Sequence, residues 1–401
     1  MARGNVRKEK LSIVKEKPRK ETFYFDYSLL LVMMFLILFG LIMVYSASYY
    51  EAMTTPSIGD PTYYVKKQAL ATALGLAGMY VVYRIPYQAF RKLGYIPYIL
   101  CYVVIFMIIP FGYEANGARR WIDLGGVIRF QAAEPVKLGM IVFFSNFIYG
   151  YRKKLNDFRT MVVMLALTAP VSLLVWRLTE NMSSALIIAA ICVVMIFVAS
   201  KDYKRYIAMG LAAIAAAAGA VYYIVWLSEN AGESATGVRG ERILAWLDLE
   251  KYASGKGYQT LQALYAIGSG GIWGKGLGQS IQKLDFLPEA QNDMIFSIIC
   301  EELGLFGGIA VILMFMILIW RMAIIASHAA DLQGSMLVVG VMAHIAVQVI
   351  LNVAVVTNTI PNTGISLPFI SYGGTSVCFL MLEMGLVFSV ARGIRITNYD
   401  D

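Results

Sequence analysis

The chain has 401 residues, of which 59% are hydrophobic and only 15% are charged. A soluble protein has about 25% charged residues, so this composition excludes a water-soluble globular fold and predicts a membrane protein. The formal net charge of +8 fits basic cytoplasmic loops better than nucleic-acid binding, because no zinc-finger spacing or RNA-binding motif accompanies it.

Ten apolar segments of roughly 20 residues follow one another along the chain, and each is long enough to cross a bilayer as a helix. They predict an all-α polytopic membrane protein with about ten transmembrane helices. The segments are 27–49, 65–83, 93–112, 131–150, 160–178, 183–199, 206–226, 294–320, 334–355 and 373–391.

Basic residues gather in alternate loops, which predicts that both termini are cytoplasmic. Residues 1–26 are expected to form a disordered basic cytoplasmic tail, 27–395 the transmembrane domain, and 396–401 a short cytoplasmic tail. The longest connection, 227–293, is an extracytoplasmic loop that precedes the eighth helix. Long loops in compact membrane proteins are usually functional, so this loop is a candidate site.

Asp293 lies where this polar loop meets the eighth apolar segment, within LPEAQNDMIFSIICEELG (287–304). A carboxylate at a helix N-terminus is favoured by the helix dipole. It could equally face a site that is open to the outside.

Glu301 and Glu302 lie deeper in the same segment. Ionisable groups at membrane depth are costly and need partners. A structural pair with a buried Lys, Arg or polar side chain is favoured over a direct functional role.

The fourth segment opens with Gln131, Glu134 and Lys137, which share one face of a helix at i, i+3, i+6. Glu134 and Lys137 could neutralise each other. Alternatively, the three side chains line a polar cavity that meets a charged ligand or a cation.

Arg119 and Arg120 lie in the predicted outside loop 113–130, where basic residues are disfavoured. Guanidinium groups suit phosphate oxygens, so a lipid pyrophosphate is one candidate ligand. Headgroup anchoring beside Trp121 is the alternative.

Polar residues and helix breakers interrupt the apolar pattern between Gln348 and Ser376. Such broken backbone could line a cavity at membrane depth, or it could be an ordinary loop between the ninth and tenth helices. The candidate cavity-lining residues are Asn352, Pro368, Ser371, Gly373 and Gly374.

Three stretches resemble the hallmark regions of the SEDS family (shape, elongation, division, sporulation). They are NGARRWIDLGGVIRFQAAEPVKL, the long run from GYQTLQALYAIGSGG to IICEELGLFGG, and PNTGISLPFISYGGTS. The run GLGQSIQKLDFLPEA is more similar to the FtsW-type members and their sporulation relatives than to the RodA-type elongation members.

This resemblance implies an inverting glycosyltransferase that polymerises lipid II, with undecaprenyl diphosphate as the leaving group. Asp293 would be the general base, while Arg119, Arg120 and Lys137 would stabilise the pyrophosphate. A divalent cation, Mg or Mn, could share that task, held by Glu134 or Asp293; no organic cofactor is expected. The implied partners are a class B penicillin-binding protein, which crosslinks the growing glycan strand, and other membrane proteins of the divisome.

The chain departs from the family where PEAHTD reads PEAQND, with Gln291 and Asn292 in place of His and Thr. Glu289 of this motif is expected to line the cavity, and Gln131 to help bind the substrate. The expected location is the bacterial cytoplasmic membrane, at the division septum. The alternatives are a RodA-type elongation or sporulation polymerase, a lipid II flippase and a non-catalytic scaffold of the divisome.

Overall fold

The computed structural model describes residues 24–115, 118–126, 128–231 and 236–394. The predicted basic tail therefore lies almost wholly outside the described residues, as does the predicted tail 396–401.

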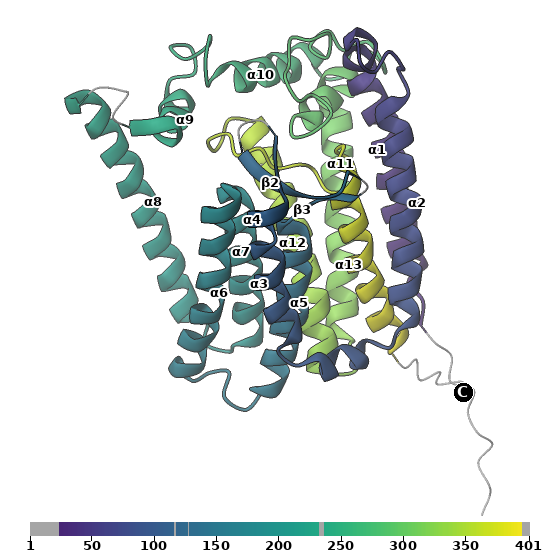
Figure 1. The fold of residues 1–401 in the computed structure, drawn as a ribbon, viewed down its shortest axis with the longest axis vertical. Helices are drawn as coiled ribbons and strands as arrows, with labels where there is room; N and C mark the ends of the chain where they lie inside the picture. The colour runs from purple at the N-terminus through teal and green to yellow at the C-terminus, as the bar shows by residue number, and fades with distance from the viewer. Residues whose placement is uncertain (1–23, 116–117, 127, 232–235, 395–401) are drawn as a thin grey trace, which may run out of the picture.

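Every predicted apolar segment coincides with a helix, which confirms the all-α polytopic fold (Figure 1). The helices are α1 (Tyr27–Thr54), α2 (Tyr63–Arg84), α3 (Ile96–Phe106), α5 (Ala133–Gly150), α6 (Phe158–Thr179), α7 (Met182–Ala199), α8 (Tyr203–Ala231), α11 (Ile295–Ser327), α12 (Leu332–Val356) and α13 (Gly374–Arg392).

The predicted count of ten transmembrane spans is not confirmed. Among the described residues, seven helices are long and apolar enough to cross a membrane: α1, α6, α7, α8, α11, α12 and α13. An eighth span arises if α2 and the 3-10 helix η1 (Tyr87–Leu93), which are bent by 85°, count together. Helix α3 has only 11 residues, and α5 includes the charged residues Glu134 and Lys137.

Both described ends of the chain lie at one end of the bundle. Phe25, just before α1, stacks on Phe388 of α13 with ring centroids 5.4 Å apart. Arg321 near the end of α11 donates to the Asp26 carboxylate at 2.6 Å. The opposite end, which we call the loop end, carries three strands together with α9 (Gly237–Leu247) and α10 (Tyr258–Gly270) (Figure 1).

The predicted outside loop 113–130 is a small antiparallel sheet, which the sequence did not predict. After the short helix α4 (Ile108–Phe111), strands β1 (Gly112–Ala115), β2 (Ala118–Leu124) and β3 (Ile128–Gln131) pair in chain order. Ile122 of β2 is fully buried and packs against Ile108 and Ala132. One face of β2 is thus fixed against the bundle.

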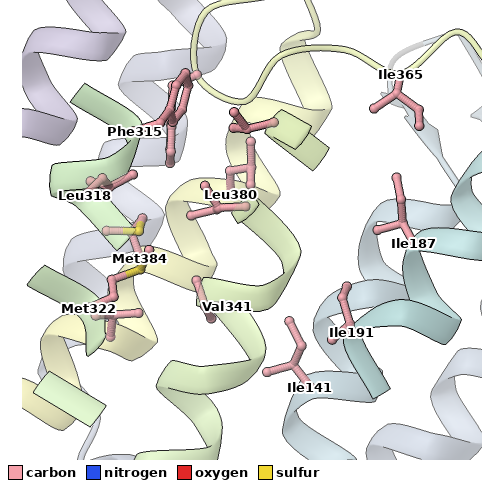
Figure 2. Packing of buried hydrophobic residues seen from close by; sticks show 14 of the residues in the cluster. Ile141, Ile187, Ile191, Phe315, Leu318, Met322, Val341, Ile365, Leu380 and Met384 are labelled. Carbon is pink, nitrogen blue, oxygen red and sulfur yellow. The ribbon is translucent and has the colours of Figure 1, made fainter. Parts of the chain in front are cut away.

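The bundle core is built from branched aliphatic side chains and methionine of several helices. Figure 2 shows Ile141 of α5, Ile191 of α7 and Val341 of α12 meeting within it. A Cβ added at Gly340 of α12 would lie 2.6 Å from the Ile141 side chain, so this glycine permits the close approach of α5. Small residues have this function in membrane helix packing.

Helix α8 differs from the others because none of its most apolar stretch is buried in the protein. Figure 1 shows it leaning away from the bundle towards α9. A helix that is apolar on all sides and unpacked suits a lipid environment.

Candidate functional site at the loop end

The backbone before α11 is held in place by a buried carboxamide. Asn352 of α12 donates through Nδ2 to the carbonyl oxygen of Asp293 at 2.8 Å and to that of Ile365 at 2.6 Å. One side chain therefore fixes the N-terminal end of α11 against the segment 357–373, which lies between α12 and α13.

The Asp293 carboxylate, which is partly buried, faces α10 and the segment 357–373. Gln259 of α10 approaches Oδ1 at 3.4 Å, and Gln259 itself accepts a hydrogen bond from Asn362 at 2.8 Å. On the other side, a Cβ added at Gly364 would lie 3.6 Å from Oδ2. The carboxylate is thus oriented by polar groups, with no lysine or arginine in ion-pair contact among the residues that the structure describes.

The pKa of Asp293 is raised to about 7, chiefly by burial and then by the negative charge of Glu289, while Arg242 of α9 acts in the opposite direction. Loss of hydration disfavours the ionised form of a carboxyl group. A carboxylate with a pKa near neutral pH is well suited to accept a proton in a reaction.

The two adjacent arginines of β2 point to different faces, because side chains alternate along a strand. Arg120 lies on the face of the buried Ile122, and its Nε is buried without a hydrogen-bond partner among the described residues. Arg119 is exposed and donates to the Gly112 carbonyl at 3.4 Å. The geometry favours Arg120 as a ligand-binding residue, and it does not favour the predicted role of Arg119.

Burial and the nearby charge of Arg242 lower the pKa of Arg120, while Glu180 acts in the opposite direction. Arginine stays charged in proteins. The lowered pKa therefore marks a guanidinium that would be stabilised by an anion.

Glu134 and Lys137 form a buried ion pair of 2.8 Å within the first turns of α5. The structure therefore agrees with the interpretation that Glu134 and Lys137 neutralise each other. Glu134 Oε2 has no hydrogen-bond partner among the described residues. Gln131 ends β3 opposite Trp121 and is half-buried. Within the described part of the chain, no hydrogen bond links these three side chains to Asp293.

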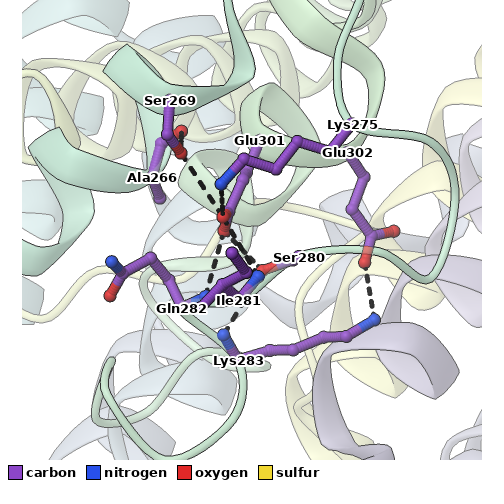
Figure 3. Close-up of polar contacts among 9 residues, drawn as sticks. All are labelled: Ala266, Ser269, Lys275, Ser280, Ile281, Gln282, Lys283, Glu301 and Glu302. Carbon is purple, nitrogen blue, oxygen red and sulfur yellow. Dashed lines mark hydrogen bonds and ion pairs between the residues drawn. The ribbon is translucent and has the colours of Figure 1, made fainter.

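Glu301 is fully buried and is surrounded by the glycine-rich loop that follows α10, as Figure 3 shows. Lys275 approaches Oε1 at 2.7 Å, and the Ser280 hydroxyl donates to Oε2 at 2.5 Å. The backbone N–H of Ile281 donates to Oε1 at 3.1 Å. These contacts make Glu301 an anchor for the loop.

Glu302 is also fully buried and has a different lysine partner. Lys283 lies 2.8 Å from Oε1, as Figure 3 shows. The hydroxyl of Ser46 in α1 donates to the same oxygen at 2.6 Å. Both glutamates therefore have the lysine and hydroxyl partners that the structural interpretation requires.

The glycine-rich loop enters a break in α11 at Gly304, where φ is +68°. The N–H groups of Lys275 and Gly276 donate to the carbonyls of Glu301 and Glu302 at 2.9 Å. A Cβ at Gly304 would lie 2.3 Å from the Ile272 carbonyl, so glycine is required there. The loop is thus part of the fold around Asp293.

The segment 357–373 is irregular backbone that reaches into the bundle. A Cβ added at Gly40, near the middle of α1, would lie 2.6 Å from the Phe369 carbonyl. The Ser371 hydroxyl accepts from the N–H of Leu367 at 2.7 Å, and Gln68 of α2 donates to the Ser371 carbonyl at 3.2 Å. Of the two interpretations left open by the sequence, broken backbone at depth is the one observed.

The remaining predicted residues of this segment support its packing. Pro368 is buried beside Phe369, and Gly373 donates its N–H to Gln68 at 3.1 Å. A Cβ at Gly374 would lie 3.4 Å from Ala71 of α2. These residues hold the segment against α2, and among the described residues none of them hydrogen-bonds to the Asp293 carboxylate.

Gln291 does not point at Asp293. Its Nε2 donates to Glu51 of α1 at 2.8 Å, and Tyr64 of α2 donates to the other Glu51 oxygen at 2.6 Å. Asn292 donates to Glu289. The two departures from the family motif thus serve to tie the loop to α1 and to itself.

Glu51 and Glu289 also border a small open pocket of about 220 Å³ next to this loop, together with Lys283 and Asp285. The pocket lies on the α1 side of the loop.

Sequence reasoning missed Gln259, Arg242 and Trp246. Gln259 is part of the GYQ run that carries the family resemblance, so that motif was a signal. Arg242 and Trp246 lie four residues apart on α9, and only the structure brings this helix to the site: Trp246 Nε1 donates to the Asn358 carbonyl at 2.9 Å.

The expected divalent cation is compatible with one pair of carboxylates. Mg²⁺ is often held by one or two carboxylates together with substrate phosphate oxygens. Asp293 and Glu289, which acts on Asp293 electrostatically, form such a pair of carboxylates. Glu134, the other candidate, is in an ion pair with Lys137. The described residues contain no group of three or more His, Cys, Asp or Glu suited to a metal.

Fold and site together define a multi-pass helical membrane protein. At one end of its bundle it has a partly buried carboxyl group whose pKa is about 7. The family model of the cell cycle proteins FtsW, RodA and SpoVE matches residues 26–396, and the chain belongs to this family.

Relatives with assigned names match nearly the full chain. Stage V sporulation protein E of Bacillus subtilis is 35% identical over 372 residues, covering 92% of this chain and 98% of that protein. A probable peptidoglycan glycosyltransferase FtsW of Trichlorobacter lovleyi is 34% identical over 380 residues, covering 93% and 94%. The corresponding protein of Geobacter sulfurreducens is 33% identical over 379 residues, covering 94% and 97%.

Solved structures support the fold. A chain of a peptidoglycan synthase complex superposes with a TM-score of 0.72 at 22% identity, covering 94% of this chain and 99% of that one. The rod shape determining protein RodA of Thermus thermophilus superposes with a TM-score of 0.61 at 23% identity, covering 94% and 98%.

Proposed function

We propose that this protein is a peptidoglycan glycosyltransferase that polymerises lipid II into glycan strands, in septal wall synthesis. Relatives that share about a third of its residues over nearly its whole length are named as probable glycosyltransferases of this kind. The observation that most supports the chemistry is the Asp293 carboxyl group at the loop end, which faces Gln259 and Gly364 and whose pKa is raised to about 7, chiefly by burial.

In the proposed reaction, the acceptor sugar hydroxyl attacks the anomeric carbon of the donor sugar. The new carbon–oxygen bond forms as the bond to the diphosphate breaks, and the diphosphate leaves with the electron pair. Asp293 takes the hydroxyl proton. The donor is α-linked and the product β-linked, so one displacement with inversion suffices and no covalent intermediate on a carboxylate is needed.

Arg120 would stabilise the charge that develops on the leaving diphosphate. A divalent cation, if bound, would neutralise part of the same charge, and Asp293 with Glu289 would hold it. Lys137 is committed to Glu134, so its effect on the diphosphate would be indirect.

We further propose that the loop end faces the outside of the bacterial cytoplasmic membrane, since the basic loops 84–92, 151–159 and 201–205 lie at the other end. A class B penicillin-binding protein would be the partner there, because one similar fold occurs in a peptidoglycan synthase complex. Division is favoured over elongation by the FtsW names of the relatives. The sporulation protein of Bacillus subtilis, at 35% identity, makes sporulation the second candidate.

The test is polymerisation of purified lipid II by the detergent-purified protein with its cognate penicillin-binding protein. Asp293→Ala should abolish glycan chains while leaving the protein folded. Asp60→Asn is the matched control, because Asp60 is a carboxylate between α1 and α2 whose ion pair with Lys66 is exposed. Chains from both variants would remove Asp293 from the mechanism; no chains from the wild type would favour the flippase or the scaffold.

A further inference from the structure

Helix α9 lies at the loop end, where Figure 1 shows it on the same side of the bundle as β2. Its Trp246 is hydrogen-bonded to Asn358, at the start of the segment that contains Asn362 and Gly364 beside Asp293. Arg242 is four residues before Trp246, so both side chains share one face of the helix. The tryptophan contact therefore places the face of α9 that carries Arg242, which is exposed, on the side of this segment.

Arg242 acts electrostatically on two groups that take part in the proposed reaction. Its positive charge acts on the Arg120 guanidinium and on the Asp293 carboxyl group. These two lie on elements far apart in the sequence, β2 and the residues before α11, and α9 connects them. No hydrogen bond or ion pair links the Arg242 or Arg120 side chain to any other residue in the described ranges.

Two like charges that approach each other without an acidic partner in contact destabilise the free protein, and an anion between them relieves that repulsion. Among the residues that the structure describes, Glu180 is the one acidic group that acts on Arg120, and it is exposed and makes no ion pair with it. Guanidinium forks match phosphate oxygens, and a diphosphate carries enough oxygens for two of them.

We propose that Arg242 of α9 and Arg120 of β2 together form the binding site for the diphosphate of the lipid-linked donor. This inference rests on the proposed function. It adds a second arginine from the long loop to the single one supplied by the sheet, and it places the leaving group beside the base.

The first measurement is binding of farnesyl diphosphate and farnesyl monophosphate to the full-length protein by calorimetry in detergent. Arg242→Ala should weaken diphosphate binding by about tenfold to a hundredfold, which corresponds to loss of one charge-assisted contact. Arg242→Lys should recover part of the affinity. Lys256→Ala, which removes an exposed cation from the same loop, is the matched control.

The second measurement is the steady-state kinetics of lipid II polymerisation for the same variants. The expected result is weaker diphosphate binding together with a raised KM for lipid II in Arg242→Ala, partly restored in Arg242→Lys and unchanged in Lys256→Ala. Equal diphosphate binding by Arg242→Ala and Lys256→Ala would overturn the proposal even if the wild type polymerises lipid II. Weakened binding in a protein that forms no chains would keep the anion site and reject the polymerase.

Discussion

Removing the negative charge of Glu289 should change the pH range in which this protein works. Burial is the largest cause of the raised pKa of Asp293, from 3.8 to about 7, and Glu289 is the second. Glu289 therefore contributes less to the rise than burial does, and we take a neighbouring charge of this kind to be worth on the order of one pH unit. In Glu289→Gln the pKa of Asp293 should fall by about that amount, while the amide oxygen can still accept from Asn292.

The size of the effect follows from the ionised fraction of the base. At pH 6 a carboxyl group of pKa about 7 is roughly 10% ionised, and one of pKa about 6 is half ionised. The kcat/KM for lipid II at pH 6 should therefore rise by up to about fivefold, and at pH 8 it should hardly change.

The assay is a pH–rate profile between pH 5 and 9 under kcat/KM conditions, with Glu250→Gln as a control that removes an exposed carboxylate from the same loop. An acidic limb that stays in place, or that moves to higher pH, would refute the electrostatic argument. An equal shift in Glu250→Gln would show that net charge, and not Glu289, sets the pKa.

Three further changes test the structure around the site. Glu302→Gln leaves the buried Lys283 without its counter-ion and should lower the free energy of unfolding by about 3–5 kcal/mol. The measurement is the Tm in detergent, and the double variant with Lys283→Met should recover part of the loss. Gly304→Ala places a side chain at φ +68° against a carbonyl and should destabilise the protein by more than about 1–2 kcal/mol in the same assay; a wild-type Tm would argue against the helix break. Gln291→His restores the family residue but faces Glu51, so the rate of polymerisation should stay near that of the wild type, and a large gain would place residue 291 at the base.

The helices were predictable because a bilayer demands long apolar segments, and each such segment became a helix. The number of membrane spans could not be predicted in the same way, because α3 is short and α5 contains Glu134 and Lys137. The sheet was missed because strands of four to seven residues leave little alternation to detect.

At the site, the sequence indicates that Glu301 and Glu302 need partners, but it does not indicate which residues those partners are. Their lysines lie 26 and 19 residues earlier in the chain, and the loop that contains them follows a path set by the break at Gly304. Hydropathy does not locate this break, because the apolar run continues directly after it from Leu305 onward. The electrostatic effect of Arg242 on Arg120 likewise depends on the tertiary arrangement and has no local signal in the sequence.

The distribution of charge separates a polymerase from a carrier. Carriers bind their substrates near the middle of the membrane. In this protein the buried carboxylates of α5 and α11 are each paired with a lysine within 2.8 Å, and so they are occupied by the fold. Asp293, Arg120 and Arg242 have no ion-pair partner within the described ranges, and they gather at the loop end. The charge that remains for a substrate therefore lies where the head of a membrane-bound lipid donor would meet it, which favours chemistry on that head over passage of the lipid through the bundle.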